Sequence, residues 1–203
     1  MDWYNFSAEE KEKLLKSWAI LEPNKQNLGC DIYGMIFNQC PEIRRLFPKM
    51  KFREDGRTDK KQNEFSFQAL RFIQVIESAV TNIDRLQNLE PILDNLGKRH
   101  GKLELSGKFR SYYWSTFLEC TIYQMRKCLS STRKFPDSEV DEAIIQWRNL
   151  LRGVMKAIKK GYYENICHRL SKMSVDHTNN RKTSVLSIGQ SSSSSFPENY
   201  DSS

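Results

Sequence analysis

Apolar residues recur every three or four positions along most of the chain up to about position 170, which is the spacing of one helix face. No stretch has the apolar–polar alternation of a half-buried strand, and no Asn-Gly or Asp-Gly turn lies between apolar runs. The pattern therefore predicts an all-α fold of seven or eight helices. In chain order, the expected helices cover residues 7–21, 28–40, 41–46, 63–81, 86–100, 107–129 and 136–168.

Local signals mark several of the expected helix ends. Ser7 and Glu10 have the spacing of a capping box at the start of the first helix. Pro41 can open a new turn but cannot continue the helix before it. The charged stretch 49–62 is expected to be a surface loop. The helix that begins near residue 86 is expected to end at Gly97 or just past His100.

The helices over 63–81 and 86–100 are expected to form the centre of the molecule. Their inward residues follow from the helical spacing of apolar positions. These residues are Phe65, Phe72, Val75, Ile76, Ala79 and Val80 in the first helix, and Leu86, Leu89, Ile92, Leu93 and Leu96 in the second.

Residues 171–203 differ from the rest in composition, because they are rich in serine and include five consecutive serines at 191–195. A segment this polar does not bury enough apolar surface to offset the entropy lost on ordering. The sequence therefore predicts one globular domain over 1–170 and a disordered Ser-rich tail over 171–203.

The formal net charge of +7 raises the possibility of nucleic-acid binding, but Lys and Arg are scattered among Asp and Glu without a basic block or recognition motif. We therefore expect no nucleic-acid partner. An acidic protein partner or an acidic membrane surface fits the charge better, and a reductase is a further candidate partner. No apolar run is long enough for a membrane span, and the N-terminus has no leader pattern. These features predict a cytoplasmic protein.

The five cysteines are not in metal-ligand spacing. Cys30 and Cys40 would lie about 15 Å apart on one helix, beyond the reach of a disulfide. Reduced thiols are the simpler interpretation. The chain has three histidines, and His100 is the one within the central helices. If imidazole holds a metal or cofactor here, His100 is the candidate ligand.

Several motifs in order along residues 7–166 resemble those of the globin family, and within it the neuroglobin-like and nematode members. Trp18 stands in the first helix, Pro41 opens the short third helix, and Phe47 follows at the corner where globins place a phenylalanine against haem. The stretches Ala79-Val80-Thr81-Asn82 and Leu96-Gly97-Lys98-Arg99-His100 resemble the end of the distal helix and the proximal histidine motif. Trp147 and Gly161-Tyr162 fit the last helix.

This resemblance implies a globin fold, a 3-over-3 helical sandwich around haem b (iron protoporphyrin IX), with His100 as the axial ligand. Neutral imidazole suits this role because it donates to iron without adding charge. The alternative for His100 is a helix-end histidine that bonds terminal carbonyl groups.

The same resemblance puts Gln68 at the distal position and Tyr33 on the distal side of the haem. Both side chains are hydrogen-bond donors, and bound dioxygen gains negative charge. Bonds of this kind are worth roughly 1.5–3 kcal/mol each. Tyr33 could instead be core filler and Gln68 solvent-exposed. Because no second histidine falls in the implied pocket, an open sixth site on five-coordinate iron is expected, unlike the usual neuroglobin pattern.

Three further residues are candidates for haem contact. Arg71 could pair with a propionate, or be a solvated surface side chain. Phe72 would crowd the distal cavity, and Leu96 would pack on the proximal face.

The expected function is reversible binding of dioxygen, in storage, transport or sensing, and nitric oxide is a second candidate ligand. The alternative is a redox enzyme on the same scaffold, either a nitric oxide dioxygenase or a peroxidase-like enzyme, with an external reductant. A haem-free helical interaction module is a third possibility, which His100 and Phe47 argue against.

Overall fold

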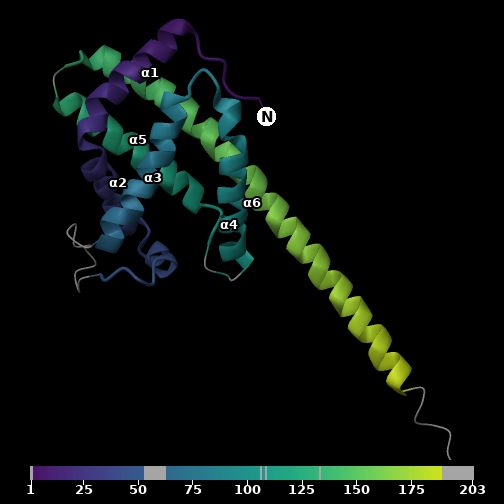
Figure 1. Cartoon of the computed structure of the whole chain (residues 1–203). Coiled ribbons are helices and arrows are strands. Elements are labelled where there is room, and N and C mark those ends of the chain that lie inside the picture. Colours follow the sequence, from purple (N-terminus) through teal and green to yellow (C-terminus); the bar gives the residue numbers. More distant parts are fainter. Residues whose placement is uncertain (1, 53–62, 106, 108, 133, 189–203) are drawn as a thin grey trace, which may run out of the picture. The chain divides into compact units, whose positions relative to one another are not determined.

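The computed structural model describes residues 2–52, 63–105, 107, 109–132 and 134–188, with the backbone alone at 105 and 175–188. Within these ranges the chain is helical and has no β-strand, so the predicted all-α class is confirmed (Figure 1). The α-helices are α1 (Ala8–Leu21), α2 (Lys25–Gln39), α3 (Asn63–Thr81), α4 (Glu90–Leu105), α5 (Tyr113–Ser131) and α6 (Asp137–Ile188). Three short 3-10 helices join them, η1 (Glu22–Asn24), η2 (Pro41–Leu46) and η3 (Leu86–Leu89).

The chain divides into two compact units, Met1–Asn165 and Ile166–Ser203. The described part of the second unit is the helical stretch 166–188. Leu170 and Met173 are exposed there, at 50% and 58%. All contacts described below belong to the first unit.

The predicted capping box is present at the start of α1. The Ser7 hydroxyl accepts a bond from the Glu10 backbone N–H, and the Glu10 carboxylate accepts one from the Ser7 backbone N–H. These bonds satisfy two of the N–H groups that a helix start leaves unpaired. The α3 helix has the bounds that the apolar pattern predicts.

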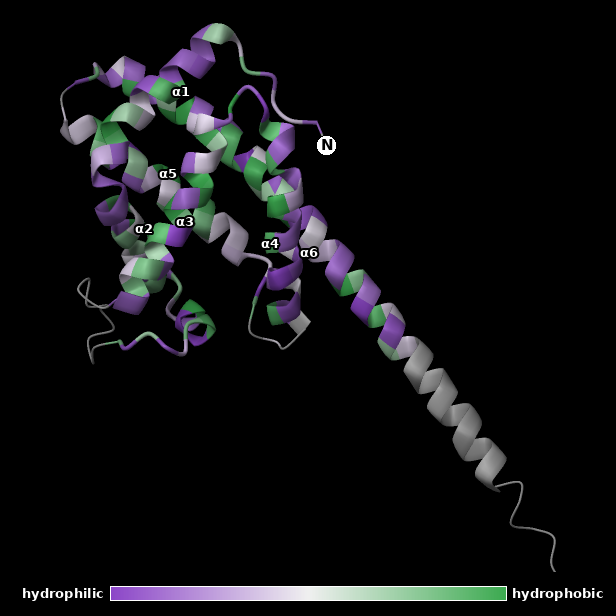
Figure 2. Cartoon of the chain, in the orientation of Figure 1, coloured by the Kyte–Doolittle hydropathy of each residue, from purple (hydrophilic) through white to green (hydrophobic). Residues whose placement is uncertain are grey.

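The core of the first unit forms where α2 packs against α3 and α5, and α1 against the same two helices. Apolar and polar residues lie on different sides of these helices, as Figure 2 shows in colour. Trp147 of α6 is fully buried, packs on Trp18, and donates a 2.8 Å hydrogen bond from its indole nitrogen to the Ser17 hydroxyl. This bond fixes the position of α6 against α1.

The α4 and α6 helices touch backbone to backbone. A Cβ on Gly97 would lie 1.9 Å from the Ile158 carbonyl oxygen, and a Cβ on Gly161 would lie 2.1 Å from that of Asp94. Any larger residue at either position would push the helices apart. The glycines therefore set the position of α4, the helix that carries His100.

The structure corrects several expectations. The α4 helix does not end at Gly97 or His100 but continues to Leu105, since Gly97 serves a close helix contact and not a helix end. Ile92, expected inward, is 65% exposed, because only one face of the first turns of α4 is covered. The helix expected over residues 107–129 begins at Tyr113 and not near Gly107, whose φ of +70° belongs to the preceding turn.

The last helix also differs from its predicted extent. It passes the expected end near His168 and continues to Ile188, into the Ser-rich segment. No glycine or proline interrupts residues 171–188, so local sequence does not stop the helix. Residues 189–203, with the serine run, and most of the predicted loop 49–62 lie outside the described residues.

Among the described residues, no helix combines the length and hydropathy that crossing a membrane requires. All five cysteines lie among the described residues, and none of them forms a disulfide.

Candidate functional site

His100 lies in the middle of α4 with its ring held by its own helix. The Nδ1 atom is 2.8 Å from the backbone carbonyl oxygen of Leu96. A carbonyl oxygen only accepts, so Nδ1 carries the proton in the neutral ring. Burial lowers the pKa of His100, and the bond to Leu96 partly offsets that effect. The result is a neutral imidazole that directs the lone pair of Nε2 away from the helix, which is the form that ligates metals.

Aromatic rings surround this imidazole. Phe109 and Trp114 lie with their ring centroids 5.4 Å and 5.1 Å from that of His100. The indole nitrogen of Trp114 is buried, and it has no hydrogen-bond partner among the described residues. An unpaired buried donor beside a candidate ligand is consistent with a site built to hold a further group.

Tyr33 is the centre of a second aromatic cluster. Its ring, 3% exposed, lies edge-on to four phenylalanine rings at centroid distances of 5.6–5.7 Å. These rings come from α2, the end of η2, α3 and α5, and they are Phe37, Phe47, Phe72 and Phe117. We call Tyr33 and these four rings the distal cluster.

Gln68 reaches Tyr33 from α3. Its amide nitrogen donates to the Tyr33 hydroxyl oxygen at 3.2 Å. In the described part of the chain the Tyr33 hydroxyl proton has no acceptor, so it stays available to a ligand. Burial raises the pKa of Tyr33 to about 12, although the Gln68 bond and the charge of Arg71 act in the opposite direction. The phenol is therefore neutral at physiological pH and able to donate.

The α5 helix connects the two sites. Phe117 contacts Tyr33 and Phe72, whereas Trp114, one turn earlier, contacts His100. The two sites together offer one neutral imidazole and two polar donors, each set among aromatic rings. The donor set matches a haem, which needs one firm axial ligand and otherwise apolar walls.

The structure locates the other predicted residues as follows. Leu96 is half-buried one turn before His100 and supplies the carbonyl that orients it. Phe47 and Phe72 are half-buried in the distal cluster. Arg71 is exposed, with its guanidinium 5.8 Å from the Phe67 ring centroid, which is the surface position that the sequence left open.

Two contacts of the site did not come from the sequence pattern. Phe109 packs on His100 from the irregular turn before α5, where helical spacing has no meaning. Phe117 closes the distal cluster, and the sequence pattern assigned it no role.

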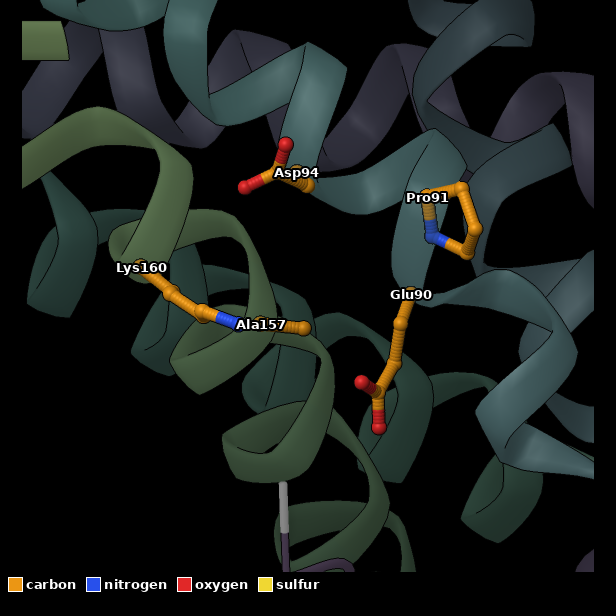
Figure 3. Close-up of a pocket in the computed structure, with 5 residues that line it drawn as sticks. All are labelled: Glu90, Pro91, Asp94, Ala157 and Lys160. Atoms are coloured by element: carbon orange, nitrogen blue, oxygen red, sulfur yellow. The ribbon is translucent and has the colours of Figure 1, made fainter. Parts of the chain in front are cut away.

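A separate pocket of about 190 Å³ lies between α4 and α6 (Figure 3). Glu90, Pro91 and Asp94 line it from α4, and Ala157 and Lys160 from α6. None of the predicted site residues borders it. Among the described residues, no three His, Cys, Asp or Glu side chains gather as a metal site.

Comparison with known proteins shows the family of the chain. The family model for globins matches residues 30–158. The chain is 28% identical to globin-related protein glb-13 of Caenorhabditis elegans over 78% of its own length, but the match spans about half of that relative, 53%. It is 25% identical to neuroglobin of Chaenocephalus aceratus, covering 78% of this chain and 94% of that one.

Two solved structures share the fold. One is described as a hexacoordinated heme protein from an anhydrobiotic tardigrade, with a TM-score of 0.65 at 21% identity, covering 79% of this chain and 97% of the other. The second is the neuroglobin of the acoel Symsagittifera roscoffensis, with a TM-score of 0.60 at 16% identity, covering 76% and 98%.

Proposed function

The chain belongs to the globin family, and from this membership we propose that it holds haem b through His100 and binds dioxygen reversibly. The observation that carries the proposal is the bond between His100 Nδ1 and the Leu96 carbonyl, which leaves Nε2 as the free donor atom. Bound ferrous haem supplies the iron at which a diatomic gas binds. The protein supplies the axial ligand, the apolar walls and the distal donors.

The distal donors are Tyr33 and Gln68. A diatomic ligand that gains negative charge at ferrous iron accepts hydrogen bonds, each worth roughly 1.5–3 kcal/mol. Because about 1.4 kcal/mol corresponds to a factor of ten, two such bonds slow release of dioxygen by several decades relative to an apolar pocket. Gln68 also holds the Tyr33 oxygen in place, and the Tyr33 proton stays available for a hydrogen bond to the bound gas.

The iron is proposed to be five-coordinate before the gas binds. In the described part of the chain, Gln68 and phenylalanine rings surround Tyr33, and none of these groups is an imidazole. A neutral amide or a protonated phenol is a weak iron ligand. The chain differs in this respect from the tardigrade protein, which is described as hexacoordinated.

The remaining pocket residues have supporting roles in this proposal. Phe47 and Phe72 form apolar walls, and Phe72 narrows the path of the incoming gas. Leu96 packs on the proximal face. Arg71, exposed on α3, is long enough to pair with a propionate once haem is present.

An absorbance spectrum of the purified full chain with haem tests the proposal. We expect a Soret band, a five-coordinate ferrous spectrum without gas and a stable oxy spectrum in air. Absence of a Soret band after reconstitution would refute haem binding. A six-coordinate low-spin ferrous spectrum would refute the open site alone.

A further inference from the structure

A line of oxidisable rings leads from His100 to the surface of the first unit. The Trp114 ring centroid lies 5.1 Å from that of His100, Tyr162 lies 5.6 Å from Trp114, and Tyr163 lies 5.0 Å from Tyr162. Trp114 and Tyr162 are 7% and 2% exposed, whereas Tyr163 is 53% exposed. Tryptophan and tyrosine are the side chains that lose an electron most readily. The row therefore has a buried end at the iron ligand and an open end in solvent.

A tyrosine releases its hydroxyl proton when it loses an electron, and a carboxylate lies beside the buried tyrosine of this row. Burial and the neighbouring Glu104 carboxylate raise the pKa of the Tyr162 phenol. The Oε2 atom of Glu104 is buried with no hydrogen-bond partner among the described residues, so it is open to the proton that Tyr162 releases on losing an electron and regains on reduction. The Trp114 indole has no acceptor in the described part of the chain, so this ring keeps its proton and passes only the electron.

The exposed end of the row lies in a basic groove. Tyr163 lines a groove of about 610 Å³ together with Arg152, Lys156, Lys159 and Lys160. No acidic side chain is among the described residues that line it. Lys160 also borders the pocket that contains Glu90 and Asp94 (Figure 3), and Arg152 helps to lower the pKa of the Glu119 carboxyl. Lys156 and Lys159 are therefore the cations most available to a ligand. The volume is that of a small-molecule site, and its charge selects an anion.

We propose that Trp114, Tyr162 and Tyr163 carry electrons from a small anionic one-electron reductant in this groove to the haem site, where hydrogen peroxide is reduced. The proposal rests on haem ligation by His100. Hydrogen peroxide accepts two electrons and two protons and leaves as two molecules of water. Two reductant molecules each lose one electron in turn, and the water-forming protons come from solvent. Tyr163 and Tyr162 each end the cycle in their reduced, protonated form.

The chain contains a matched control for the exit residue. Tyr112 is 50% exposed, similar to Tyr163. Among the ring contacts of the described residues, the connection from Tyr112 to Trp114 passes through Tyr113 and then Phe109. Phenylalanine is much harder to oxidise than tyrosine. Replacing Tyr112 therefore removes an equally exposed phenol outside the proposed path.

The test uses the full haem-loaded chain, hydrogen peroxide and ascorbate as the anionic donor. Relative to wild type, Tyr163→Phe is expected to lower kcat for ascorbate oxidation about tenfold with KM unchanged, which is 1.36 kcal/mol in the barrier. The double variant Lys156→Gln/Lys159→Gln is expected to raise KM about threefold or more for ascorbate, since two surface charges are lost, and not for a neutral hydroquinone donor. Tyr112→Phe is expected to behave as wild type.

A second readout does not depend on turnover. After one equivalent of peroxide without ascorbate, a nitroso spin trap is expected to label Tyr163, as found by peptide mass, and ascorbate is expected to suppress the label. A normal Soret band with unchanged kinetics in Tyr163→Phe, or a label confined to other residues, would overturn the path and leave the proposed function standing. Loss of kcat in Tyr112→Phe equal to that in Tyr163→Phe would also overturn it. A wild-type chain without a Soret band would overturn both proposals.

Discussion

Gln68 donates a hydrogen bond of 3.2 Å to the hydroxyl of Tyr33, a residue 35 positions away on another helix. The bond uses the lone pair of the phenol and leaves its proton free. One donor thereby orients another, so the two residues are expected to act on a bound gas as a unit and not independently.

The first prediction concerns the dissociation of dioxygen from the haem-loaded protein. Tyr33→Phe removes the hydroxyl but keeps the ring contacts, and we expect the off-rate to rise about tenfold or more, as loss of one charged-acceptor bond implies. Gln68→Leu is expected to raise it as well. The double variant should show less than the sum of the two effects in free energy, because Gln68 positions Tyr33. Stopped-flow displacement of dioxygen measures these rates.

The control for this experiment is Tyr123→Phe, which removes a phenol from a 54% exposed ring on α5. Its off-rate is expected to equal that of wild type. Unchanged rates in both Tyr33→Phe and Gln68→Leu would refute the distal hydrogen bonds. Fully additive effects would refute the coupling alone.

The second prediction concerns pH. Because burial raises the pKa of Tyr33 to about 12, the phenol keeps its proton well above the ordinary tyrosine value of 10.0. The off-rate should therefore be constant from neutral pH to about 10, where an exposed tyrosine would already be titrating. It should rise only as the pH approaches the raised value and the donor is lost. An inflection at or below the ordinary value, absent in Tyr33→Phe, would contradict this prediction.

The third prediction concerns the iron ligand. His100→Ala is expected to abolish the five-coordinate ferrous spectrum, since no other imidazole belongs to the site, and added imidazole is expected to restore part of it. His168→Ala is the matched control, because His168 is exposed in the second unit. The measurement is the ferrous absorbance spectrum of each variant, recorded at equal protein concentration. A normal ferrous spectrum in His100→Ala would refute ligation by this residue.

The helix periodicity of the sequence predicted much of this fold because most helices bury one face. The α3 bounds and the α1 capping box both follow from local signals that tertiary contacts did not override. Ile92 shows the limit of this reasoning. Its spacing fits the inward face, but no element covers it, and coverage depends on the positions of other helices.

Gly97 shows a second limit. A glycine near a helix end indicates a helix stop when only the sequence is known. Here the same residue lies in the middle of α4, where the Ile158 carbonyl would be 1.9 Å from a Cβ. The difference lies in a contact 61 positions away, which no local pattern records. The aromatic row from Trp114 to Tyr163 could not be predicted from the sequence for the same reason, because it forms only where α5 packs against α6.

The last prediction follows from the contact between α4 and α6. Gly97→Ala places a methyl group against the Ile158 backbone, which cannot rotate away as a side chain would. We expect a loss of about 1–3 kcal/mol or more in the free energy of unfolding, as in other overpacked sites. Gly34→Ala is the matched control, because it also lies within a helix but a Cβ there meets nothing within 4 Å. That variant should gain about 0.5–1 kcal/mol from reduced backbone entropy in the unfolded chain. Urea denaturation at equal haem occupancy measures both free energies of unfolding, since bound ligand itself adds stability.

Because Gly97 adjoins Leu96, whose carbonyl orients His100, Gly97→Ala should also weaken haem retention, and Gly34→Ala should not. Equal stabilities of the two variants would show that α4 can move away from α6 at little cost. The backbone contact would then not be what positions His100.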